Sequence, residues 1–526
     1  MSSPPRPPLV PLVVLAALGA VVLTLRQHVF TIDSYYYLWD TEFADRSRLL
    51  HPHHLALQPL FRGWWRLWQW FEWPGRAVSP LQVLNLGLTL AGLAVAWRLL
   101  RRLAVAAAPA AAWCALLAVS YVTWSQATQA DSLPLFALLA SALLWWSARL
   151  ALGPPPTSRT ALAVGVTLAA GVLAHQVLVL WAIPLAWMVG RRARGAGRWR
   201  LTLSCLGPAG ALVLAGYVVA AAVATGSLAP ASLWRWFTGY SEEFAGRYGL
   251  LANLTSREVP RGLLSAFLTG GPLKPYLYGG EPLGPAVVLR GGPFLMVPAL
   301  LLAGFWRLQG AWRTASPDHR QAWVNLAVLV AVSALFAAWW DPGQRKFWAP
   351  VVTGLVALAA AGWSSGPRAA GAVRTLPVAV IAAVVLGYNL AGGILPRHVQ
   401  RDALQPLVMF VARHVGPEDA VILREDRVWQ AAIYFEPDKP VHGIPGALSD
   451  RDDPEHRVLE AALADARRAL TAGGVLYVAD SEWPGIAARL RDDLGPLPAP
   501  EVVLPYGDLE LGPPDQVLLA LRLPRG

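Results

Sequence analysis

The stretch TALAVGVTLAAGVLAHQVLVLWAIPLAWMVG at 160–190 decides how this chain crosses a membrane. It is too long for one ordinary span, because a bilayer core takes about 20 apolar residues as helix, and it is short for two. Arginines flank it on both sides: Arg149 and Arg159 precede it, and five more lie at 191–200. Basic residues favour the cytoplasmic side of a membrane. Both groups can lie there only if 160–190 is a hairpin of two short helices, with His175 at its outer tip.

The whole chain has the composition of a polytopic membrane protein with some soluble mass. Its 526 residues are 55% hydrophobic and 15% charged, whereas soluble globular proteins average about 25% charged residues. The 25 tryptophans are typical of belts at the membrane interface. The formal charge of +11 comes mostly from arginines in short loops between apolar stretches, so it does not indicate nucleic-acid binding. The two cysteines, Cys114 and Cys205, lie inside predicted spans and show no disulfide or metal-ligand spacing.

Eleven apolar stretches are predicted to span the bilayer. They lie at 8–25, 79–98, 103–124, 133–148, 160–175, 177–190, 201–223, 285–306, 321–340, 347–363 and 375–395. The first could also be read as a signal peptide, but we expect a retained helix because its n-region holds only Arg6. The charge rule that resolves 160–190 also places the N-terminus inside and the C-terminus outside.

The predicted fold class is therefore a polytopic α-helical membrane protein with about 11 transmembrane helices, N-in and C-out, and a C-terminal soluble α/β domain. The transmembrane domain takes residues 1–396, with outer loops at 26–78 and 226–284, and the soluble domain takes 397–526. We expect a multi-pass protein of the plasma (inner) membrane. Its active site and its C-terminal domain are expected to be extracytoplasmic.

The tail at 397–526 is charged and alternates helical and strand patterns. RDALQPLVMFVARHV and PEHRVLEAALADARRALTAG indicate amphipathic helices, and AVILRE, KPVHGI, GGVLYVAD, EVVLPY and QVLLALRL indicate strands. Alternation of this kind predicts a small α/β domain with a mostly parallel sheet. The tail lacks the glycine-rich fingerprint and the phosphate-binding loop of nucleotide-binding domains, so nucleotide binding is not expected.

Carboxylates gather directly after the first span, in TIDSYYYLWD at 31–40. Asp33 lies beside Ser34 and three tyrosines, and a carboxylate there can act as a general base or orient a ligand at the membrane surface. A solvated loop aspartate is the alternative interpretation. We favour the catalytic role for Asp33 and take Asp40 as the second candidate.

Three histidines follow in HPHHLALQPL at 51–60. His51, His53 and His54 have a spacing that could ligate a divalent metal, but no carboxylate is placed by the sequence to complete a ligand set. The stronger interpretation is a turn that leads into an amphipathic helix lying in the membrane interface. No cofactor is firmly implied. We expect His53 or His54 to face the same cavity as Asp33 and to bind substrate.

Two more ionisable residues lie at the outer ends of predicted spans. Asp131 stands at the start of the fourth span, in WSQATQADS, and His175 stands at the hairpin tip. Ionisable groups at such depth are costly, and therefore they are usually functional or paired. Solvation by lipid headgroups is the alternative.

A pair of cations fills the short outer loop WWDPGQRKFWAP at 339–350. Arg345 and Lys346 run against the positive-inside bias. Arginine binds phosphate oxygens in a bidentate fork and lysine binds them as a point charge, so this loop suits a lipid phosphate at the bilayer edge. Ordinary snorkelling of the two side chains is the alternative. Weaker candidates of the same kind are Arg247, Tyr248, Lys274 and Tyr276.

These pieces, in this order, resemble the GT-C glycosyltransferase superfamily, and within it the protein O-mannosyltransferase-like bacterial membrane proteins. The similarity rests on Asp33 after the first helix, HPHHLALQPL, the arginine cluster of VLNLGLTLAGLAVAWRLLRRL, the segment VTWSQATQADSLPLFALLASALL and the histidine of GVLAHQVLVLWAIPLAW. It covers about residues 8–363 and is diffuse. Asp131 stands where the family usually has a glutamate.

The resemblance implies an inverting hexosyl or pentosyl transferase with a polyprenyl-phosphate-linked sugar as donor. The acceptor would be a protein, lipid or glycan on the outer face, with Asp33 as the base and with Arg345 and Lys346 holding the departing lipid phosphate. Membrane lipids are the other expected partners. The alternative function is a transporter or flippase of a lipid-linked saccharide, which is not an enzyme. Such proteins place ionisable groups near the bilayer midplane, whereas here the polar residues cluster at one face.

Overall fold

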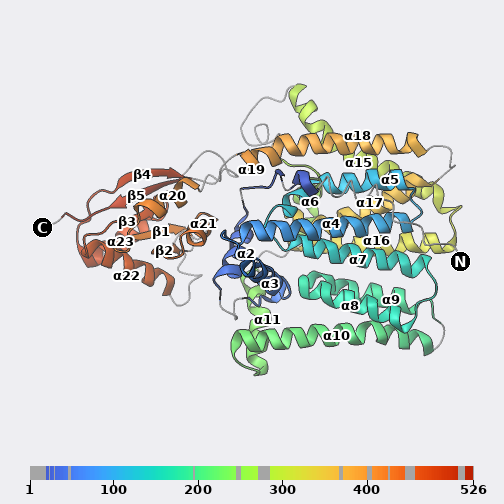
Figure 1. Cartoon of the computed structure of the whole chain (residues 1–526), viewed down its shortest axis with the longest axis horizontal. Helices are drawn as coiled ribbons and strands as arrows, with labels where there is room; N and C mark the ends of the chain where they lie inside the picture. Colours follow the sequence, from blue (N-terminus) through green and yellow to red (C-terminus); the bar gives the residue numbers. More distant parts are fainter. Residues whose placement is uncertain are drawn as a thin grey trace. The chain divides into compact units, whose positions relative to one another are not determined.

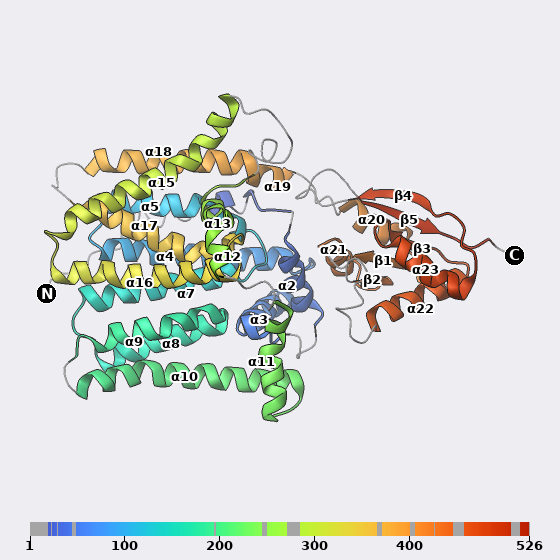
Figure 2. The same cartoon turned by 180° about the vertical axis from the view of Figure 1, so that it is seen from behind.

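The computed structural model divides the chain into two compact units. The residues it describes are 19–22, 24–28, 30–44, 49–193, 196–244, 250–270, 285–365, 371–399, 405–424, 427–444, 457–506 and 516–524. The first unit takes Met1–Gln27 and Asp40–Pro396, and the second takes His28–Trp39 and Arg397–Gly526. The first unit is a bundle of long helices and the second is built on a small sheet (Figures 1 and 2).

The first unit consists almost entirely of helices and helical turns. The helices are α3 Leu57–Trp70, α4 Val78–Arg102, α5 Ala107–Val119, α6 Tyr121–Ala127, α7 Leu133–Leu152, α8 Ser158–Ala174, α9 Ala182–Gly190, α10 Ala196–Thr225, α11 Pro230–Phe244, α12 Leu250–Thr255, α13 Glu258–Phe267, α15 Pro285–Trp312, α16 Pro317–Trp340, α17 Ala349–Ser364, α18 Gly371–Asn389 and α19 Leu395–Val399. Tighter turns are η1 Pro52–His54, η2 Gln176–Trp181 and η5 Arg345–Trp348, and η7 Leu390–Ile394 is a π-helical turn.

Seven helices in the described part of the chain are long and apolar enough to cross a membrane. There are eight if α5 and α6, which are bent by 63° at Ser120, count as one broken span. Each of them coincides with a predicted stretch, so the chain is an integral membrane protein by the length and hydropathy of its helices. The predicted span at 8–25 lies mostly outside the described residues, and the total of eleven stays a prediction.

The stretch at 160–190 forms two short apolar helical segments instead of one span. α8 is 17 residues long and ends at Ala174, and His175 separates it from η2 and α9. The segments pack against each other, and α8 also packs along α10. A helix of this length rises about 25 Å, less than the roughly 30 Å of a bilayer core. The corner at His175 therefore stops short of the ends of the longer helices, and η1 packs over it.

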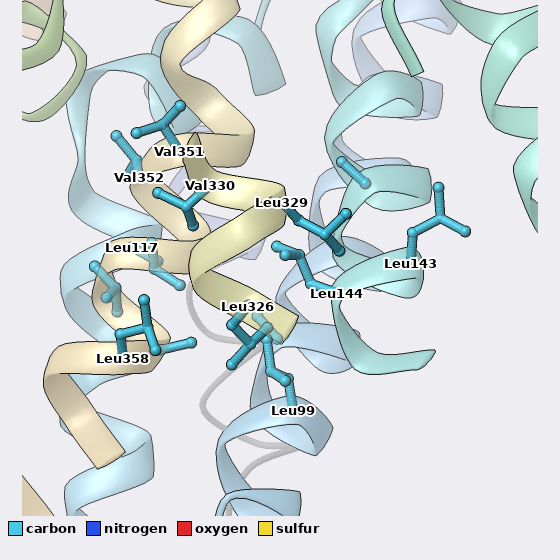
Figure 3. Close-up of a cluster of buried hydrophobic side chains, with 14 of the residues drawn as sticks. Leu99, Leu117, Leu143, Leu144, Leu326, Leu329, Val330, Val351, Val352 and Leu358 are labelled. Atoms are coloured by element: carbon cyan, nitrogen blue, oxygen red, sulfur yellow. The ribbon is translucent and has the colours of Figure 1, made fainter. Parts of the chain in front are cut away.

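The centre of the bundle is closely packed with aliphatic side chains. Leucines and valines from five helices meet there, and they are labelled in Figure 3. They are Leu99 of α4, Leu117 of α5, Leu143 and Leu144 of α7, Leu326, Leu329 and Val330 of α16, and Val351, Val352 and Leu358 of α17, and all are buried. Helices α15 and α17 approach most closely at Gly362, where any side chain would overlap the carbonyl oxygen of Gly304. This core fixes the helix ends on which the candidate site is built.

The sheet of the second unit has five strands in the order β2-β1-β3-β5-β4. The strands are β1 Ala420–Arg424, β2 Val441–Ile444, β3 Leu476–Ala479, β4 Glu501–Tyr506 and β5 Gln516–Leu521, and the helices are α20 Gln405–His414, α21 Arg427–Phe435, α22 Arg457–Thr471 and α23 Trp483–Leu494. All five strands coincide with predicted ones. The sequence analysis did not identify α21 and α23.

The expectation of a mostly parallel sheet is wrong for half of the strand pairs. β1 pairs in parallel with β2 and β3, but β5 pairs antiparallel with β3 and β4. The difference follows from the connections. Parallel neighbours need a crossover, usually a helix, which α21 and α22 supply on either side of β2. β4 and β5 follow each other in the sequence with no described helix between them, and consecutive strands of this kind pair antiparallel.

Residues 28–39, which the sequence analysis placed in the first domain, group with the second unit. They include most of α2, which spans Ile32–Glu42. Tyr35 is fully buried, and its ring lies 6.3 Å from that of Tyr434 and 6.2 Å from that of Phe435, both on α21. The last three residues of α2 belong to the first unit, so one short helix carries residues of both.

Candidate functional site

The hairpin corner at His175 is the centre of the candidate site. The backbone N–H of Ala56 donates to the carbonyl oxygen of Leu173 at 2.8 Å, which ties the turn after η1 to the last turn of α8. The ring of His54 consequently lies 4.7 Å from that of His175, edge to face. The first loop thus covers the corner of the hairpin at 160–190. The loop contributes the imidazole of His54, and the hairpin contributes that of His175.

The other two histidines of the first loop complete a group of four. The rings of His51 and His53 lie 5.4 Å apart, and that of His51 lies 6.1 Å from that of His54. The imidazole Nδ1 of His51 accepts a hydrogen bond from the backbone N–H of His53 at 3.2 Å. The amide Nε2 of Gln176 lies 3.2 Å from the ring of His53. The structure therefore brings together His51, His53, His54 and His175, as the sequence predicted only in part.

Burial keeps the imidazoles of the first loop neutral. It lowers the pKa of His51 to about 4. Burial, followed by the charges of His51 and Lys346, lowers the pKa of His53 to about 3. Burial also lowers the pKa of His54 well below its ordinary value. A neutral imidazole offers one N–H donor and one nitrogen acceptor, so at neutral pH these rings present hydrogen-bonding groups and no charge of their own.

Lys346 is the cation associated with this group. It lies in η5 at the end of the short turn after α16, and its charge acts on the pKa of His53 and His54. The next residue, Phe347, is buried with its ring 5.9 Å from that of His175. Trp340, the last residue of α16, lies 5.9 Å from His53. An ammonium close to hydrogen-bonding imidazoles is a combination that can bind an anion with several oxygen atoms.

Arg345 points to a different neighbour from Lys346. Its guanidinium carbon lies 4.6 Å from the ring centre of Tyr121, which is buried at the start of α6. A guanidinium stacked on an aromatic face keeps its edge available for hydrogen bonds. The two cations of the loop thus belong to adjacent but distinct surroundings, which their sequence positions did not predict.

The turn that carries these cations is held by α13 through a close contact. A side chain at Gly262 would overlap the carbonyl oxygen of Pro342, and the indole N–H of Trp348 donates to that same oxygen at 3.0 Å. Gly262 therefore allows α13 to pack directly on the turn at 342–348.

We expect Gly262→Ala to destabilise the protein by about 1–3 kcal/mol, because the added methyl forces α13 away from the turn. The measurement is thermal unfolding in detergent, with Gly63→Ala as the matched control. Gly63 also lies in a helix, α3, and a Cβ there would meet nothing within 4 Å. Equal melting temperatures for the two variants would contradict this account of the α13 contact.

Asp131 is buried, with 2% of its surface exposed, and it lies just before α7. Its Oδ1 accepts from the backbone N–H of Leu133 at 3.1 Å and from the hydroxyl of Ser132 at 3.3 Å, at the N-terminus of α7. The amide of Asn85 donates to its carbonyl oxygen at 3.1 Å. The carboxylate thus satisfies a backbone N–H in the first turn of α7, which gives Asp131 a structural role that the sequence analysis did not consider. It also fixes the start of α7, whose Phe136 ring lies 4.8 Å from that of His175.

The two candidate carboxylates of the first loop lie on one short helix. Asp33 is half-buried in the first turn of α2 and belongs to the second unit. Asp40 belongs to the first unit, where its Oδ2 accepts from the amide Nε2 of Gln58 at 3.2 Å. That Asp33 faces the same cavity as His53 or His54 stays a prediction.

Two expectations remain, the weaker phosphate-binding candidates and a possible metal site. Arg247, Tyr248, Lys274 and Tyr276 lie outside the described residues. Within the described ranges no group of three or more His, Cys, Asp or Glu side chains is arranged to hold a metal ion. Residues that sequence reasoning missed are Gln58, Tyr121 and Gln176. Only Gln176 carried a signal, as the neighbour of His175 at the hairpin tip.

Comparison with known proteins was made by sequence and by fold. No family model matches the chain, and no curated protein sequence matches it either. Solved structures do match. ArnT from Cupriavidus metallidurans bound to undecaprenyl phosphate is 14% identical, with a TM-score of 0.57 over 98% of this chain and 99% of that chain. The apo state of the same protein gives the same values.

The oligosaccharyltransferase of Archaeoglobus fulgidus in its apo form is 13% identical, with a TM-score of 0.50 over 98% of this chain and 76% of that chain. Identities this low establish likeness of fold and nothing finer. ArnT and the oligosaccharyltransferase are both GT-C glycosyltransferases. The resemblance inferred from the sequence is thereby confirmed at the level of architecture: the chain has the fold of the GT-C membrane glycosyltransferases.

Proposed function

We propose that this chain is a membrane glycosyltransferase that moves a sugar from a polyprenyl-phosphate donor to an acceptor. The observation that carries the proposal is the group of four imidazoles at one end of a GT-C bundle, next to the ammonium of Lys346, whose neighbour Phe347 packs against His175. A lipid phosphate carries the negative charge that this ammonium would neutralise. The solved complex of ArnT with undecaprenyl phosphate supports a donor of this class.

In the proposed reaction Asp33 accepts the proton of the acceptor hydroxyl, with Asp40 as the second candidate. The acceptor oxygen attacks the anomeric carbon of the sugar from the face opposite the phosphate, and the bond from that carbon to the phosphate oxygen breaks. The electron pair of this bond stays on the lipid phosphate. Lys346 and Arg345 stabilise the charge that develops on it, which is the electrostatic part of the catalysis.

The imidazoles have a different role in this scheme. At His51 and His175 the Nδ1 atom accepts a backbone N–H, so each neutral ring carries its proton on Nε2, a donor that matches sugar hydroxyls and phosphate oxygens alike. His53 and His54 would contribute hydrogen-bonding groups of the same kind. Asp131 would act at a distance, through the start of α7 and Phe136. The acceptor is a protein, lipid or glycan.

The extracytoplasmic placement of the site is inferred from charge. Arg101 and Arg102 end α4, and Arg149 lies in the last turn of α7. Arg191 follows α9. The candidate site lies at the other ends of these helices, since it includes the start of α7 and the corner between α8 and η2. Basic residues favour the cytoplasmic side, so the site would face outward.

A reporter of membrane sidedness tests this placement. Fused after Arg200, it should read as cytoplasmic, and fused after Gly526 it should read as external, because the arginines at 191–200 anchor that loop inside. The measurement is activity of a reporter pair, one member active only in the cytoplasm and the other only outside. Reversal of either result would overturn the proposed orientation of the hairpin at 160–190.

The activity itself is tested with purified full-length protein in proteoliposomes. Polyprenyl-phosphate sugars with a radiolabelled sugar are supplied together with extracts of envelope glycans, lipids and proteins. The expected result is release of free polyprenyl phosphate with transfer of label to an acceptor. Movement of intact donor between leaflets without cleavage would instead favour the flippase, and it would refute the transferase.

A further inference from the structure

α2 carries both candidate carboxylates on one face. Asp33 and Asp40 are seven residues apart in this 11-residue helix. At 3.6 residues per turn they point in directions that differ by roughly 20°, and they are about 10 Å apart along the axis. An isolated helix of fewer than about 12 residues is marginal in water. The direction of this acidic face therefore depends on what holds α2 in place.

Gln58 of α3 holds the end of α2 through two hydrogen bonds. Its side chain is buried, with 1% of its surface exposed. The amide Nε2 donates to Oδ2 of Asp40 at 3.2 Å, and Oε1 accepts from the hydroxyl of Thr41 at 3.3 Å. The side-chain amide of Gln58 thus holds both the carboxylate of Asp40 and the hydroxyl of Thr41.

Arg62, one turn further along α3, holds the backbone at the same place. Its Nη2 donates to the carbonyl oxygen of Asp40 at 2.8 Å and to that of Ala44 at 2.6 Å. The last carbonyls of a helix have no partner within the helix, and the negative end of the helix dipole is there. A guanidinium at this position therefore caps the C-terminus of α2.

The first part of α2 is anchored on its other side. Tyr35 lies two residues after Asp33, about 200° around the helix. It is fully buried against Phe30, Tyr434 and Phe435 within the second unit. Tyr35 and Asp33 therefore lie on opposite sides of α2.

We infer that Gln58 and Arg62 are positioning residues, which fix Asp40 and the C-terminal end of α2 for the transfer reaction. The inference rests on the proposed function for its consequence in catalysis, and on the hydrogen bonds for its geometry. A hydrogen bond donated to a carboxylate favours its charged form. Gln58 consequently sets both the direction of Asp40 and its readiness to stay ionised.

Two substitutions of Gln58 separate positioning from mere packing. Gln58→Leu keeps the volume and removes both hydrogen bonds. Gln58→Glu still accepts from Thr41 but places a like charge against Asp40. We expect kcat to fall roughly tenfold in Gln58→Leu, with the affinity for undecaprenyl phosphate unchanged. Because this inference requires Asp40 to be ionised for transfer, the acid limb of the kcat profile should move to higher pH, further for Gln58→Glu than for Gln58→Leu. A residue that only packs would lower stability without moving that limb.

Hydrogen exchange measured by mass spectrometry tests whether α2 is held in place, and it does not depend on a transfer assay. Amides of residues 32–44 should exchange faster in Gln58→Leu and in Arg62→Met than in the wild type, while the core of α4 and α7 stays protected. Gln69→Leu, an exposed position on the same helix, is the matched control. If Gln58→Leu behaves as Gln69→Leu does in both exchange and the pH profile, the inference is overturned.

The two proposals fail in different ways. A wild-type protein that neither binds undecaprenyl phosphate nor cleaves a polyprenyl-phosphate sugar would refute the proposed function. The exchange of residues 32–44 would still decide whether Gln58 and Arg62 hold α2. Conversely, an active protein whose exchange and pH profile ignore Gln58 would refute the positioning role alone.

Discussion

Asp33→Asn is expected to lower the rate of sugar transfer by about 10²-fold or more, because general base catalysis typically contributes 10²–10⁴-fold. The amide keeps the shape of the carboxylate but cannot accept the proton of an acceptor hydroxyl. The effect should appear in kcat, with the affinity for undecaprenyl phosphate unchanged. Stability should change little, since a carboxylate in the first turn of a helix contributes about 0.3–1 kcal/mol. The measurement is single-turnover transfer in nanodiscs.

A variant of another candidate carboxylate, Asp131→Asn, serves as a control. Asp131→Asn is informative because the side-chain oxygen of asparagine can still accept from the N–H of Leu133, so the start of α7 should be kept. A large loss of transfer in that variant would point to chemistry at Asp131. Turnover of Asp33→Asn at the wild-type rate would move the role of the base to Asp40 or Asp131, and our assignment would be wrong.

Removal of the two cations at 345–346 is expected to have the second largest effect, on donor binding. Arg345→Ala and Lys346→Ala should each weaken the affinity for a polyprenyl-phosphate sugar about tenfold to a hundredfold. A charge-assisted hydrogen bond is worth on the order of 1.5–3 kcal/mol. Arg345→Lys should restore binding only in part, because lysine cannot form the bidentate fork. Binding is measured by isothermal titration in nanodiscs.

Lys346→Ala has a further consequence that distinguishes it from Arg345→Ala. The charge of Lys346 helps to hold the pKa of His53 and His54 low. Without it both pKa values rise, so the imidazoles begin to gain protons at a higher pH than in the wild type. Donor binding in Lys346→Ala should then strengthen as the pH falls, since a protonated imidazole replaces part of the lost charge.

A matched cation near the site controls for general electrostatics. Arg261 lies on α13, which packs on η5, and its exposed guanidinium is paired with Glu258 at 3.1 Å. Arg261→Ala should leave donor affinity unchanged, because an exposed pair is largely screened. An unchanged affinity in Arg345→Ala/Lys346→Ala would mean that the two cations only snorkel. The donor site would then have to be sought around Arg247 and Lys274.

Elements defined by local pattern were predictable from the sequence. Seven helices that could cross a membrane and all five strands of the tail coincide with stretches identified by hydropathy or alternation. The corner at His175 was predicted because arginines on both sides of 160–190 allow one arrangement. Such signals are local, since the bilayer and the solvent act on each segment separately. The helices α21 and α23 were missed because they are short, 9 and 12 residues, and lie between stronger strand patterns.

What the sequence by itself determined is a membrane-embedded helical protein with an α/β tail, and a list of polar residues at the ends of its apolar stretches. The tertiary structure alone decided which of them meet. It gathered His51, His53 and His54 around His175. It also gave the side chains of Arg345 and Lys346 different neighbours, with Arg345 stacked on Tyr121. The physical reason is that these encounters depend on packing between segments far apart in the chain. The hydrogen bond from Ala56 to Leu173 is one such contact, and no periodicity or composition encodes it.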